Sequence, residues 1–531
     1  AMHYVFNSPV DKIVFDVSHQ SYVHKMLTGR MDAFLNPAYY DKVTGYTNPR
    51  ESEHDFFTIG HTSTAVSLAG GLARGRDLLG GHGNVIAVVG DGSLSGGEAF
   101  EGLDSGATLG SNFIVVVNDN DMSIAENHGG LYGNLRLLRE TDGRAACTYF
   151  ESLGYDYRYV AYGNDLRSLI DAFTAVKDTD HPVVVHINTQ KGKGYAPAEA
   201  HKEQFHYGAP FDRATGNPLN MDEREDYSDI FATHMLEMME KNPAVGVITA
   251  GTPGVLGFTP ERRKQAGRQF IDVGIAEQDA VALASGMAKA GARPCFGVVS
   301  SFIQRAYDQL SQDVAIDSNP AVLNIFYAGI VGMTDVTHLG WFDIALISNI
   351  PGWVYLAPTC KQEYLSMLDW AMAQTRYPVA IRIPAMGVVN SSDTFDSDYA
   401  DLNRYKVVTE GRDVAIIAAG SMFGTGKAAA EKLCTCGINA TLINPRYLSG
   451  VDTGLLERLK ADHRLVITLE DGVLDGGFGE KIARHYGLSD MKVRCYGVPK
   501  CFLDRYNPRT LMHDCRLEPE LIASDVCALL K

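Results

Sequence analysis

Residues 84–126 carry the pattern that most constrains the fold of this chain. The apolar, β-branched run 85–89 predicts a buried parallel strand, and the run 113–117 predicts a second one. A Gly-Asp-Gly turn at 90–92 and a helical segment of small residues lie between them. Ligands of open α/β sheets bind at the carboxyl ends of the strands. We therefore expect a binding site where these two strands end.

The polar residues that follow the two strands are suited to a metal ion. Asp91 offers a carboxylate and Asn120 an amide oxygen, and Mg²⁺ accepts such ligands while it also contacts phosphate. A helix that begins after Gly92 would direct its N–H groups at the same place, which favours an anion. The alternative is an ordinary strand–helix–strand unit with a glycine turn and an asparagine-rich loop. The spacing of 29 positions from Asp91 to Asn120 favours a metal-bound diphosphate.

Composition narrows the class of protein. A chain of 531 residues is too long for one core and suggests about three domains. The net charge of −17 disfavours nucleic acid and anionic membranes as partners. No apolar run has transmembrane length, and no targeting segment is recognised. The nine cysteines are dispersed, which favours free thiols in a reducing cytoplasm.

Several ordered motifs resemble known thiamine-diphosphate enzymes. The Gly-Asp-Gly turn with Asn120 is similar to the cofactor motif of transketolases and their relatives. Further motifs are spread over nearly the whole chain: DVSHQSYVHKMLTGR at 16–30, GHTST at 60–64, the Lys-Gly pattern from 191 to Phe205-His206, IAEQ at 275–278, SSFIQRAYDQ at 300–309 and THLGWFD at 337–343. These segments resemble the 1-deoxy-D-xylulose-5-phosphate synthase family.

The resemblance implies an α/β fold of three domains. Two are doubly wound, thiamine-diphosphate-binding domains: residues 1–206 would bind diphosphate and Mg²⁺, and residues 227–386 the pyrimidine ring. A smaller C-terminal α/β domain of the transketolase type would span 410–531, pack at a homodimer contact and carry no core chemistry. Residues 207–226 and 387–409 are predicted linkers. The family has further residues upstream, so we expect a naturally short member or a trimmed chain.

The resemblance also assigns roles to residues. The metal ligands it implies are Asp91, Asn120 and, through its main-chain carbonyl, Met122. The cofactor-binding residues it implies are His61, Ser63, Gly90, Asp91, Gly92, Ser93, Asn120, Met122, Ile124, Lys191, Glu277 and Phe302. The catalytic residues it implies are Glu277, His19, His61, His206, His338 and Arg305.

Each assignment has a structural alternative. The apolar run 13–17 predicts a short buried strand, and His19 lies just past its end. Taken alone, His19 is more often structural, and the hydroxyls of residues 62–64 are usually helix caps. Lys191 suits a solvated basic turn, and Glu277 suits dipole compensation in a first helical turn. Phe302 suits core packing and Arg305 a solvated charge. In the resembled family, Glu277 exchanges a proton with the pyrimidine and so activates the cofactor. The four histidines would move protons, because the pKa of histidine is near neutrality.

The chain departs from the family where substrate phosphate is expected to bind. Tyr327 and Ala385 stand at the positions of two arginines that, in the synthases, hold the phosphate of glyceraldehyde 3-phosphate. Arginine suits this task because it is always charged and bidentate. Each charge-assisted hydrogen bond contributes about 1.5–3 kcal/mol, so the loss weakens phosphate binding. We expect Arg382 to compensate in part.

Two further departures concern the substrate site. The aspartate that precedes the family histidine by four positions is Thr334 here, with Asp335 one place along. Residues 127–148 are short and are predicted to be loop-like, where the family has a longer mobile segment. The effect of this difference on a lid over the site is open.

The predicted activity is that of a thiamine-diphosphate-dependent carboligase. It would decarboxylate a 2-oxo acid such as pyruvate and join the two-carbon unit to an aldehyde, either glyceraldehyde 3-phosphate or another acceptor. With the former, the product feeds isoprenoid, thiamine and pyridoxal phosphate synthesis. The first alternative is ketol transfer between sugar phosphates, as in transketolase. The second is a catalytically silent paralogue that binds a partner.

Overall fold

The computed structural model of the chain describes residues 1–207, 210–219 and 224–531. It divides into two compact units. The first comprises residues 1–223, 250–252 and 272–276, and the second comprises 224–249, 253–271 and 277–531. The predicted linker 207–226 lies partly outside the described residues, and the domain boundaries stay predictions. In the described part of the chain, no helix has the length and apolar character needed to cross a membrane.

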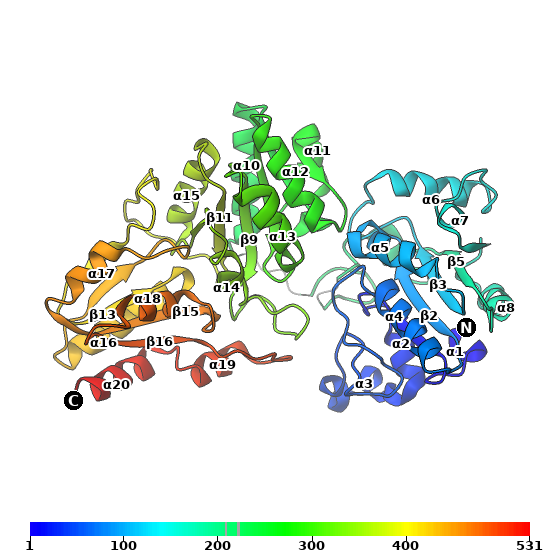
Figure 1. Ribbon diagram of the computed structural model, residues 1–531, viewed down its shortest axis with the longest axis horizontal. Helices are drawn as coiled ribbons and strands as arrows, with labels where there is room; N and C mark the ends of the chain where they lie inside the picture. Colours follow the sequence, from blue (N-terminus) through cyan, green and yellow to red (C-terminus); the bar gives the residue numbers. More distant parts are fainter. Residues whose placement is uncertain (208–209, 220–223) are drawn as a thin grey trace. The chain divides into compact units, whose positions relative to one another are not determined.

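The first unit is built on a five-stranded parallel sheet in the order β1-β2-β3-β5-β4. Figure 1 labels its strands β2, β3 and β5, which are neighbours in this order. Both predicted strands of the opening motif are present and are neighbours. The register pairs Gly90 with Asn118, so the two strands end at the same edge. The strands are β1 Lys12–Phe15, β2 Val85–Gly90, β3 Phe113–Asp119, β4 Asp156–Val160 and β5 Pro182–Asn188.

This sheet is covered on both faces, as expected for a doubly wound fold. On β3, Val115 and Val117 are buried in one cluster with residues of α4 (Ala65–Leu78) and α5 (Gly97–Gly106). The alternating Ile114 and Val116 are buried in another with residues of α8 (Leu166–Val176). Because a parallel sheet is buried on both faces, its strands are continuous apolar runs. The remaining helices of this unit are α1 Met2–Val5, α2 Tyr22–Lys25, α3 Asp32–Leu35, α6 Gly130–Glu140, α7 Tyr149–Leu153 and α9 Ala196–Ala200.

Two local predictions in the first unit are wrong. The strand expected over 13–17 ends at Phe15, because Val17 and Ser18 have φ of 57° and 67°. The segment 127–148 is not loop-like, because α6 occupies much of it. Tyr132, Leu135 and Leu138 recur at helical spacing and are buried, which stabilises this helix against the sheet.

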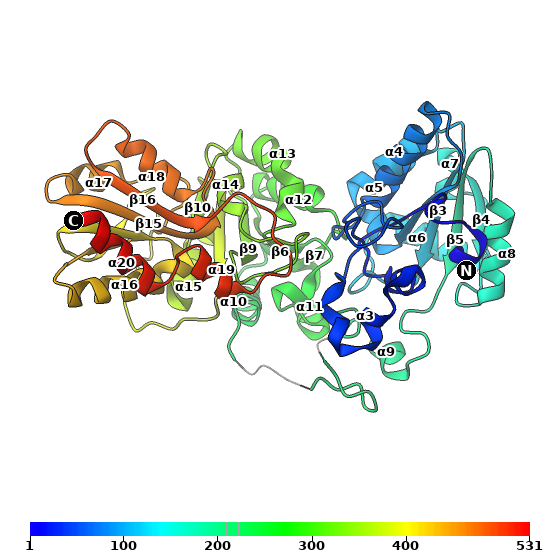
Figure 2. The same ribbon diagram turned by 90° about the horizontal axis from the view of Figure 1, so that it is seen from below.

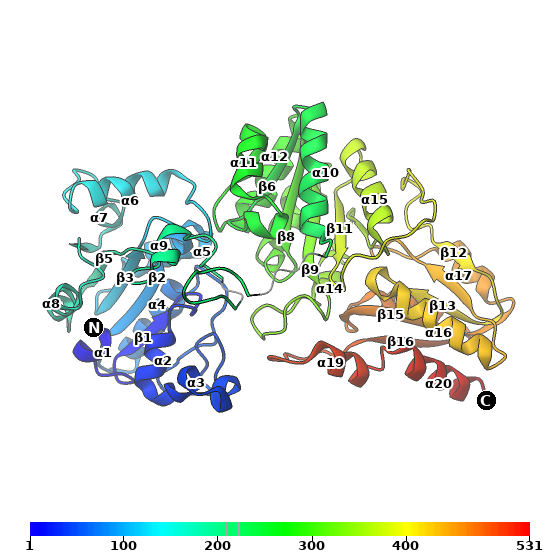
Figure 3. The same cartoon turned by 180° about the vertical axis from the view of Figure 1, so that it is seen from behind.

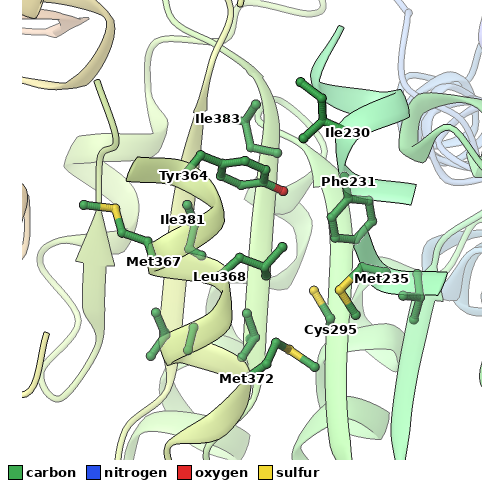
Figure 4. Close-up of a cluster of buried hydrophobic side chains, with 14 of the residues drawn as sticks. Ile230, Phe231, Met235, Cys295, Tyr364, Met367, Leu368, Met372, Ile381 and Ile383 are labelled. Carbon is green, nitrogen blue, oxygen red and sulfur yellow. The ribbon is translucent and has the colours of Figure 1, made fainter. Parts of the chain in front are cut away.

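The second unit contains two sheets. The first has six strands in the order β10-β11-β9-β8-β6-β7. Helices α10 (Tyr227–Lys241) and α15 (Lys361–Ala373) contribute to one buried cluster with this sheet, in which Phe231 and Leu368 lie near Cys295 of β8 (Figure 4). The strands are β6 Val245–Thr249, β7 Phe270–Asp272, β8 Arg293–Val299, β9 Val322–Ala328, β10 Val354–Leu356 and β11 Val379–Pro384. The other helices are α11 Pro260–Ala266, α12 Glu277–Lys289, α13 Tyr307–Gln309 and α14 Asp343–Ile347.

The second sheet of this unit, called the third sheet below, has five strands in the order β12-β14-β13-β15-β16. Its strands β15 and β16 lie side by side in Figure 2. Only its edge strand β12 is antiparallel to its neighbour. Its core includes Leu339 and Trp341, which come from the connection between β9 and α14. The strands are β12 Lys406–Thr409, β13 Asp413–Ala418, β14 Thr441–Asn444, β15 His463–Val473 and β16 Lys492–Val498. The helices are α16 Phe423–Thr435, α17 Thr453–Leu459, α18 Phe478–Tyr486, α19 Pro508–Asp514 and α20 Pro519–Leu530.

Candidate active site

The first unit places the predicted metal ligands at the ends of β2 and β3. Asp91 is 1% exposed, and Oδ1 of Asn120 is buried with no hydrogen-bond partner among the described residues. A buried amide oxygen without a donor is costly unless something else satisfies it. Burial, and then the charge of Asp119, raise the pKa of Asp91 to about 7. A bound cation would supply the missing partner of the Asn120 oxygen and would favour the ionised form of Asp91. These residues therefore fit a magnesium ion.

Asn127 also belongs to this cluster, and the sequence analysis missed it. Its Nδ2 donates to Oδ2 of Asp91 at 2.7 Å, which orients the carboxylate. Its own Oδ1 is buried and has no hydrogen-bond partner in the described part of the chain. Asn127 follows the predicted ligand Met122 on the same short loop, so its position after the second strand was the available signal.

Gly92 allows the two loops of this cluster to approach each other. A Cβ atom on Gly92 would lie 2.5 Å from Cβ of Ser123, which is closer than side chains tolerate. The hydroxyl of Tyr132 donates to the main-chain oxygens of Asp91 and Gly92 at 3.1 and 3.2 Å. A Cβ on Gly90 would meet nothing within 4 Å, so there is open space beside the turn. The hydroxyl of Tyr132 thus holds the turn in place, and the space beside Gly90 is open, as the binding of a cofactor phosphate requires.

Ser63 ties the loop before α4 to this turn. Its hydroxyl donates to the main-chain oxygen of Ser93 at 2.7 Å, and its N–H donates to Asp16 at 2.9 Å. The capping alternative is wrong here, because Thr64 is the N-cap of α4 and makes no side-chain cap bond. His61 lies in the same loop and is partly exposed.

Lys191, His206 and His19 are brought together in the first unit. Nζ of Lys191 lies 2.6 Å from the main-chain oxygen of Ser123 and 3.1 Å from Nδ1 of His206. The rings of His19 and His206 lie 5.4 Å apart. Burial lowers the pKa of Lys191 to about 8, so it stays an ammonium group at neutral pH. The solvated basic turn is therefore excluded for Lys191.

The expected pKa near neutrality is wrong for His206. Burial, and then the charges of Lys191 and His19, lower the pKa of His206 to about 3. His206 is therefore a neutral imidazole at pH 7. In this structure the ring of His206 accepts a hydrogen bond that fixes its orientation, and it does not take up a proton from solvent at neutral pH.

The second unit places Glu277 as the first residue of α12, where it is 2% exposed. Nη1 of Arg305 lies 3.4 Å from Oε2 of Glu277. Burial raises the pKa of Glu277, and the charge of Arg305 opposes this effect. Burial that raises the pKa of a carboxyl above its ordinary value makes it hold a proton more readily, which suits a general acid–base group.

Phe302 and His338 lie close to each other in the same unit. Phe302 follows β8, and its ring stands edge-on to His338 with centroids 5.4 Å apart. Asp335 accepts a hydrogen bond from Nδ1 of His338 at 3.0 Å. The shifted aspartate therefore pairs with the histidine, even though it stands one place from the family position. Phe302 and Arg305 also share one tight turn, in which the N–H of Arg305 donates to the main-chain oxygen of Phe302 at 3.2 Å.

The two positions that lack arginine lie on neighbouring strands. Ala328 of β9 pairs with Pro384 of β11, so Tyr327 and Ala385 flank one register position at the carboxyl edge. Tyr327 is 39% exposed and has a φ of 53°, which is strained for a bulky residue. A Cβ on Gly332 would lie 2.1 Å from the oxygen of Tyr327, so the following loop folds closely over this strand end.

The expected compensation by Arg382 is wrong. Its side chain is buried and its Nε donates to Asp343 at 2.7 Å, while its Nη1 pairs with Asp471. Tyr355 also donates to Asp343, and Ser421 donates to Asp471 at 2.8 Å. The guanidinium is committed to joining the two sheets of the second unit.

The glycine-rich segment 475–479 is not a nucleotide loop. The first N–H groups of α18 donate to the buried Glu470, from Phe478 at 2.9 Å and from Gly479 at 2.8 Å. The chain thus supplies its own anion at this helix terminus.

Three family models match parts of the chain. Residues 1–148 match the family model of 1-deoxy-D-xylulose-5-phosphate synthase, and residues 224–388 match that of the transketolase pyrimidine binding domain. Residues 403–522 match the transketolase C-terminal domain. The 1-deoxy-D-xylulose-5-phosphate synthase of Desulforudis audaxviator is 38% identical over 551 residues, which cover 96% of this chain and 86% of that protein. The chain belongs to the 1-deoxy-D-xylulose-5-phosphate synthase family.

As a member of the synthase family, the chain is a thiamine-diphosphate-dependent transferase. The family protein of Symbiobacterium thermophilum is likewise 38% identical, over 573 residues that cover 100% of this chain and 87% of that protein. A solved split-gene transketolase, described as an inactive beta4 tetramer, aligns with a TM-score of 0.50 and 23% identity, covering 56% of this chain and 96% of that chain. This likeness shows a shared fold alone. The predicted fold class and family are confirmed.

Proposed function

We propose that this chain is a carboligase that removes carbon dioxide from a 2-oxo acid such as pyruvate and joins the remaining two-carbon unit to an aldehyde. The observation that carries this proposal is Glu277, a buried carboxyl at a helix start with Arg305 at 3.4 Å. With glyceraldehyde 3-phosphate as acceptor, the product would be 1-deoxy-D-xylulose 5-phosphate.

The proposed acceptor substrate differs from the one that the resembled family uses. Tyr327 and Ala385 lie together at one strand edge, and Arg382 is bound to Asp343 and Asp471. Neither of the two replaced positions can bind a phosphate bidentately. We therefore propose an aldehyde acceptor without a phosphate group, and glyceraldehyde 3-phosphate as a poor substrate.

The residues have distinct roles in this proposal. Asp91, Asn120 and the main-chain carbonyl of Met122 would hold Mg²⁺, and Asn127 orients Asp91. When bound, thiamine diphosphate supplies the electron sink that the loss of carbon dioxide needs. Glu277 would exchange a proton at the pyrimidine end of the site.

The histidines would orient substrate and move protons. His338, held by Asp335, is the candidate proton acceptor in the second unit. His19 and His61 are the candidates in the first unit, where the neutral His206 would orient substrate through hydrogen bonds. Arg305 would tune the proton affinity of Glu277, because its charge lowers the pKa that burial raises. We further propose a cytoplasmic homodimer and the domain boundaries 1–206, 227–386 and 410–531.

A coupled assay tests the proposed function. Purified protein with thiamine diphosphate and Mg²⁺ should release carbon dioxide from pyruvate, and an aldehyde should accelerate the release. Glu277→Gln should lower the rate by at least about 10³-fold, in the range of a lost acid–base group. Glu240→Gln, at an exposed glutamate of α10, is the matched control and should change nothing.

Other outcomes separate the alternatives. Ketol transfer from a ketose phosphate without carbon dioxide release would identify a transketolase-type enzyme. Cofactor binding without turnover of any 2-oxo acid or ketose phosphate would indicate a silent paralogue. Light scattering of the purified chain tests the homodimer.

A further inference from the structure

The segment 499–507, between β16 and α19, contacts the loop 329–338 that follows β9 (Figures 1 and 3). The hydroxyl of Tyr506 donates to the main-chain oxygens of Ile330 and Met333 at 2.6 and 3.1 Å. Oδ1 of Asp504 accepts a hydrogen bond from the N–H of Val336 at 3.1 Å. One segment of the third sheet's domain thus fixes three points of this loop.

The same loop sets the orientation of His338. Oδ1 of Asp335 accepts hydrogen bonds from the N–H of Thr337 at 3.1 Å, from its hydroxyl at 2.5 Å and from Nδ1 of His338 at 3.0 Å. Burial alone would raise the pKa of Asp335, but these hydrogen bonds hold it below its ordinary value. A carboxylate on Nδ1 fixes the tautomer, so the lone pair of His338 is on Nε2.

The bond to Asp504 acts at the centre of this turn. Val336 stands between Asp335, which accepts the hydrogen bonds, and Thr337, which donates two of them. If the N–H of Val336 were released, the main chain between these two residues would lose its bond to the segment 499–507 and keep only the bonds within the turn. The carboxylate and the imidazole would then be held less firmly in their common orientation.

The segment 499–507 is itself anchored. The rings of Tyr506 and Trp341 lie 5.3 Å apart, and Trp341 is fully buried in the core of the third sheet. Arg505 has a φ of 49°, a conformation that a residue with a side chain rarely adopts. Strain of this kind persists only where the surroundings determine it, and it is often associated with function.

We propose that Asp504 and Tyr506 are positioning residues that act on the reaction through Asp335 and His338. The third domain, which the family resemblance leaves without chemistry, therefore sets the geometry of a catalytic histidine. This inference rests on the proposed function for its kinetic consequence. Its structural part, that the segment holds the loop, stands on the hydrogen bonds alone.

The chain offers matched variants for the test. Tyr506→Phe removes the two hydroxyl bonds and keeps the ring that packs on Trp341. Tyr486→Phe is the control, because its hydroxyl also donates to a main-chain oxygen of the same domain, that of Leu456 at 2.7 Å. Asp504→Leu removes the acceptor, whereas Asp504→Asn keeps an oxygen that can accept the bond from Val336.

Two readouts on the full-length holoenzyme decide the outcome. Hydrogen exchange of peptides spanning 330–338 should become about tenfold faster in Tyr506→Phe and Asp504→Leu, as expected for lost hydrogen bonds. The kcat with pyruvate and an aldehyde should fall by a similar factor, while the Kd for thiamine diphosphate stays unchanged. Asp504→Asn and Tyr486→Phe should match the wild type in all three measurements.

Three results would overturn the inference. Exchange in 330–338 that is equally fast in Tyr506→Phe and Tyr486→Phe would show that the segment does not hold the loop. Faster exchange with an unchanged kcat would show that the loop's order does not matter for the reaction. A kcat of Asp504→Asn as low as that of Asp504→Leu would refute the hydrogen-bond role. A wild-type protein without turnover would refute the proposed function, and the exchange data would still decide whether the segment orders the loop.

Discussion

Nζ of Lys191 donates a hydrogen bond to Nδ1 of His206 over 3.1 Å. An ammonium group has no acceptor, so Nδ1 accepts and the proton of His206 is on Nε2. His338 is held in the opposite tautomer, since its Nδ1 faces the carboxylate of Asp335. His206 therefore carries an N–H group in the first unit, and the Nε2 of His338 carries a lone pair in the second.

The depressed pKa of His206 makes the protein sensitive to acid. Below about pH 6.5 the unfolded chain binds a proton at this residue, whereas the folded chain does not until about pH 3. Stability is therefore lost as the pH falls below 6.5. His206→Asn should reduce the loss of unfolding free energy between pH 7 and pH 5 by roughly 1–2 kcal/mol, measured by urea denaturation.

His181 provides the control of opposite sign for this experiment. It is exposed in the same unit, and the hydrogen bonds that it donates to Asp180 and Asp156 raise its pKa. The stability that His181 contributes to the fold is present at low pH and is lost as the pH rises. His181→Asn should therefore not reduce the acid sensitivity, and a reduction equal to that of His206→Asn would contradict the prediction.

Metal binding should release a proton from Asp91. Burial and the charge of Asp119 raise its pKa to about 7, so at pH 6 the carboxyl is largely protonated and Mg²⁺ must displace the proton. Calorimetry in buffers of different ionisation enthalpy should show proton release at pH 6 and nearly none at pH 8. The affinity should rise by roughly tenfold over this range. Equal proton release at both pH values would refute the prediction.

Arg382→Met should destabilise the second unit. It leaves Asp343 and Asp471 buried without their cation, which costs about 3–5 kcal/mol of unfolding free energy. Chemical denaturation measures the change. Arg464→Met breaks an exposed pair with Asp413 and should cost less than about 1 kcal/mol. Equal costs for the two variants would argue against a structural role for Arg382.

The substrate preference should follow the two positions at the strand edge. Tyr327→Arg with Ala385→Arg should raise kcat/KM for a phosphorylated aldehyde over its unphosphorylated analogue by roughly 10–100-fold, since each charged hydrogen bond contributes about 1.5–3 kcal/mol. Steady-state kinetics with the matched pair of aldehydes measure the ratio. High efficiency of the wild type with glyceraldehyde 3-phosphate would remove the basis of this prediction.

The sequence predicted the strands that lie in the interior of the first sheet. Runs such as 85–89 and 113–117 are buried on both faces, so their residue types alone specify them. The sequence pattern failed to predict a helix within 127–148, because glycine, asparagine and arginine separate the apolar positions of α6. It also extended β1 over Val17, because a left-handed valine follows from the surrounding loop and not from its own preference.

The candidate site was predicted only as far as local motifs reach. Asp91, Asn120 and Glu277 each stand at the end of a strand or the start of a helix, where the sequence pattern points directly to a site. The roles of Asn127, Arg382 and Asp504 depend on partners far along the chain. Asp471 lies 89 residues from Arg382, and no local pattern could have indicated that pairing.

Trp341 lies in the core of the third sheet although its chain segment leads out of the second sheet. An exchange of genes at a boundary near residue 400 would therefore separate this indole from its neighbours. The domain that follows is a poor module for recombination, because a newly acquired version would need to fit the tryptophan of its host. Relatives of this chain should inherit the two parts together, and substitutions at Trp341 and Tyr506 should occur in concert.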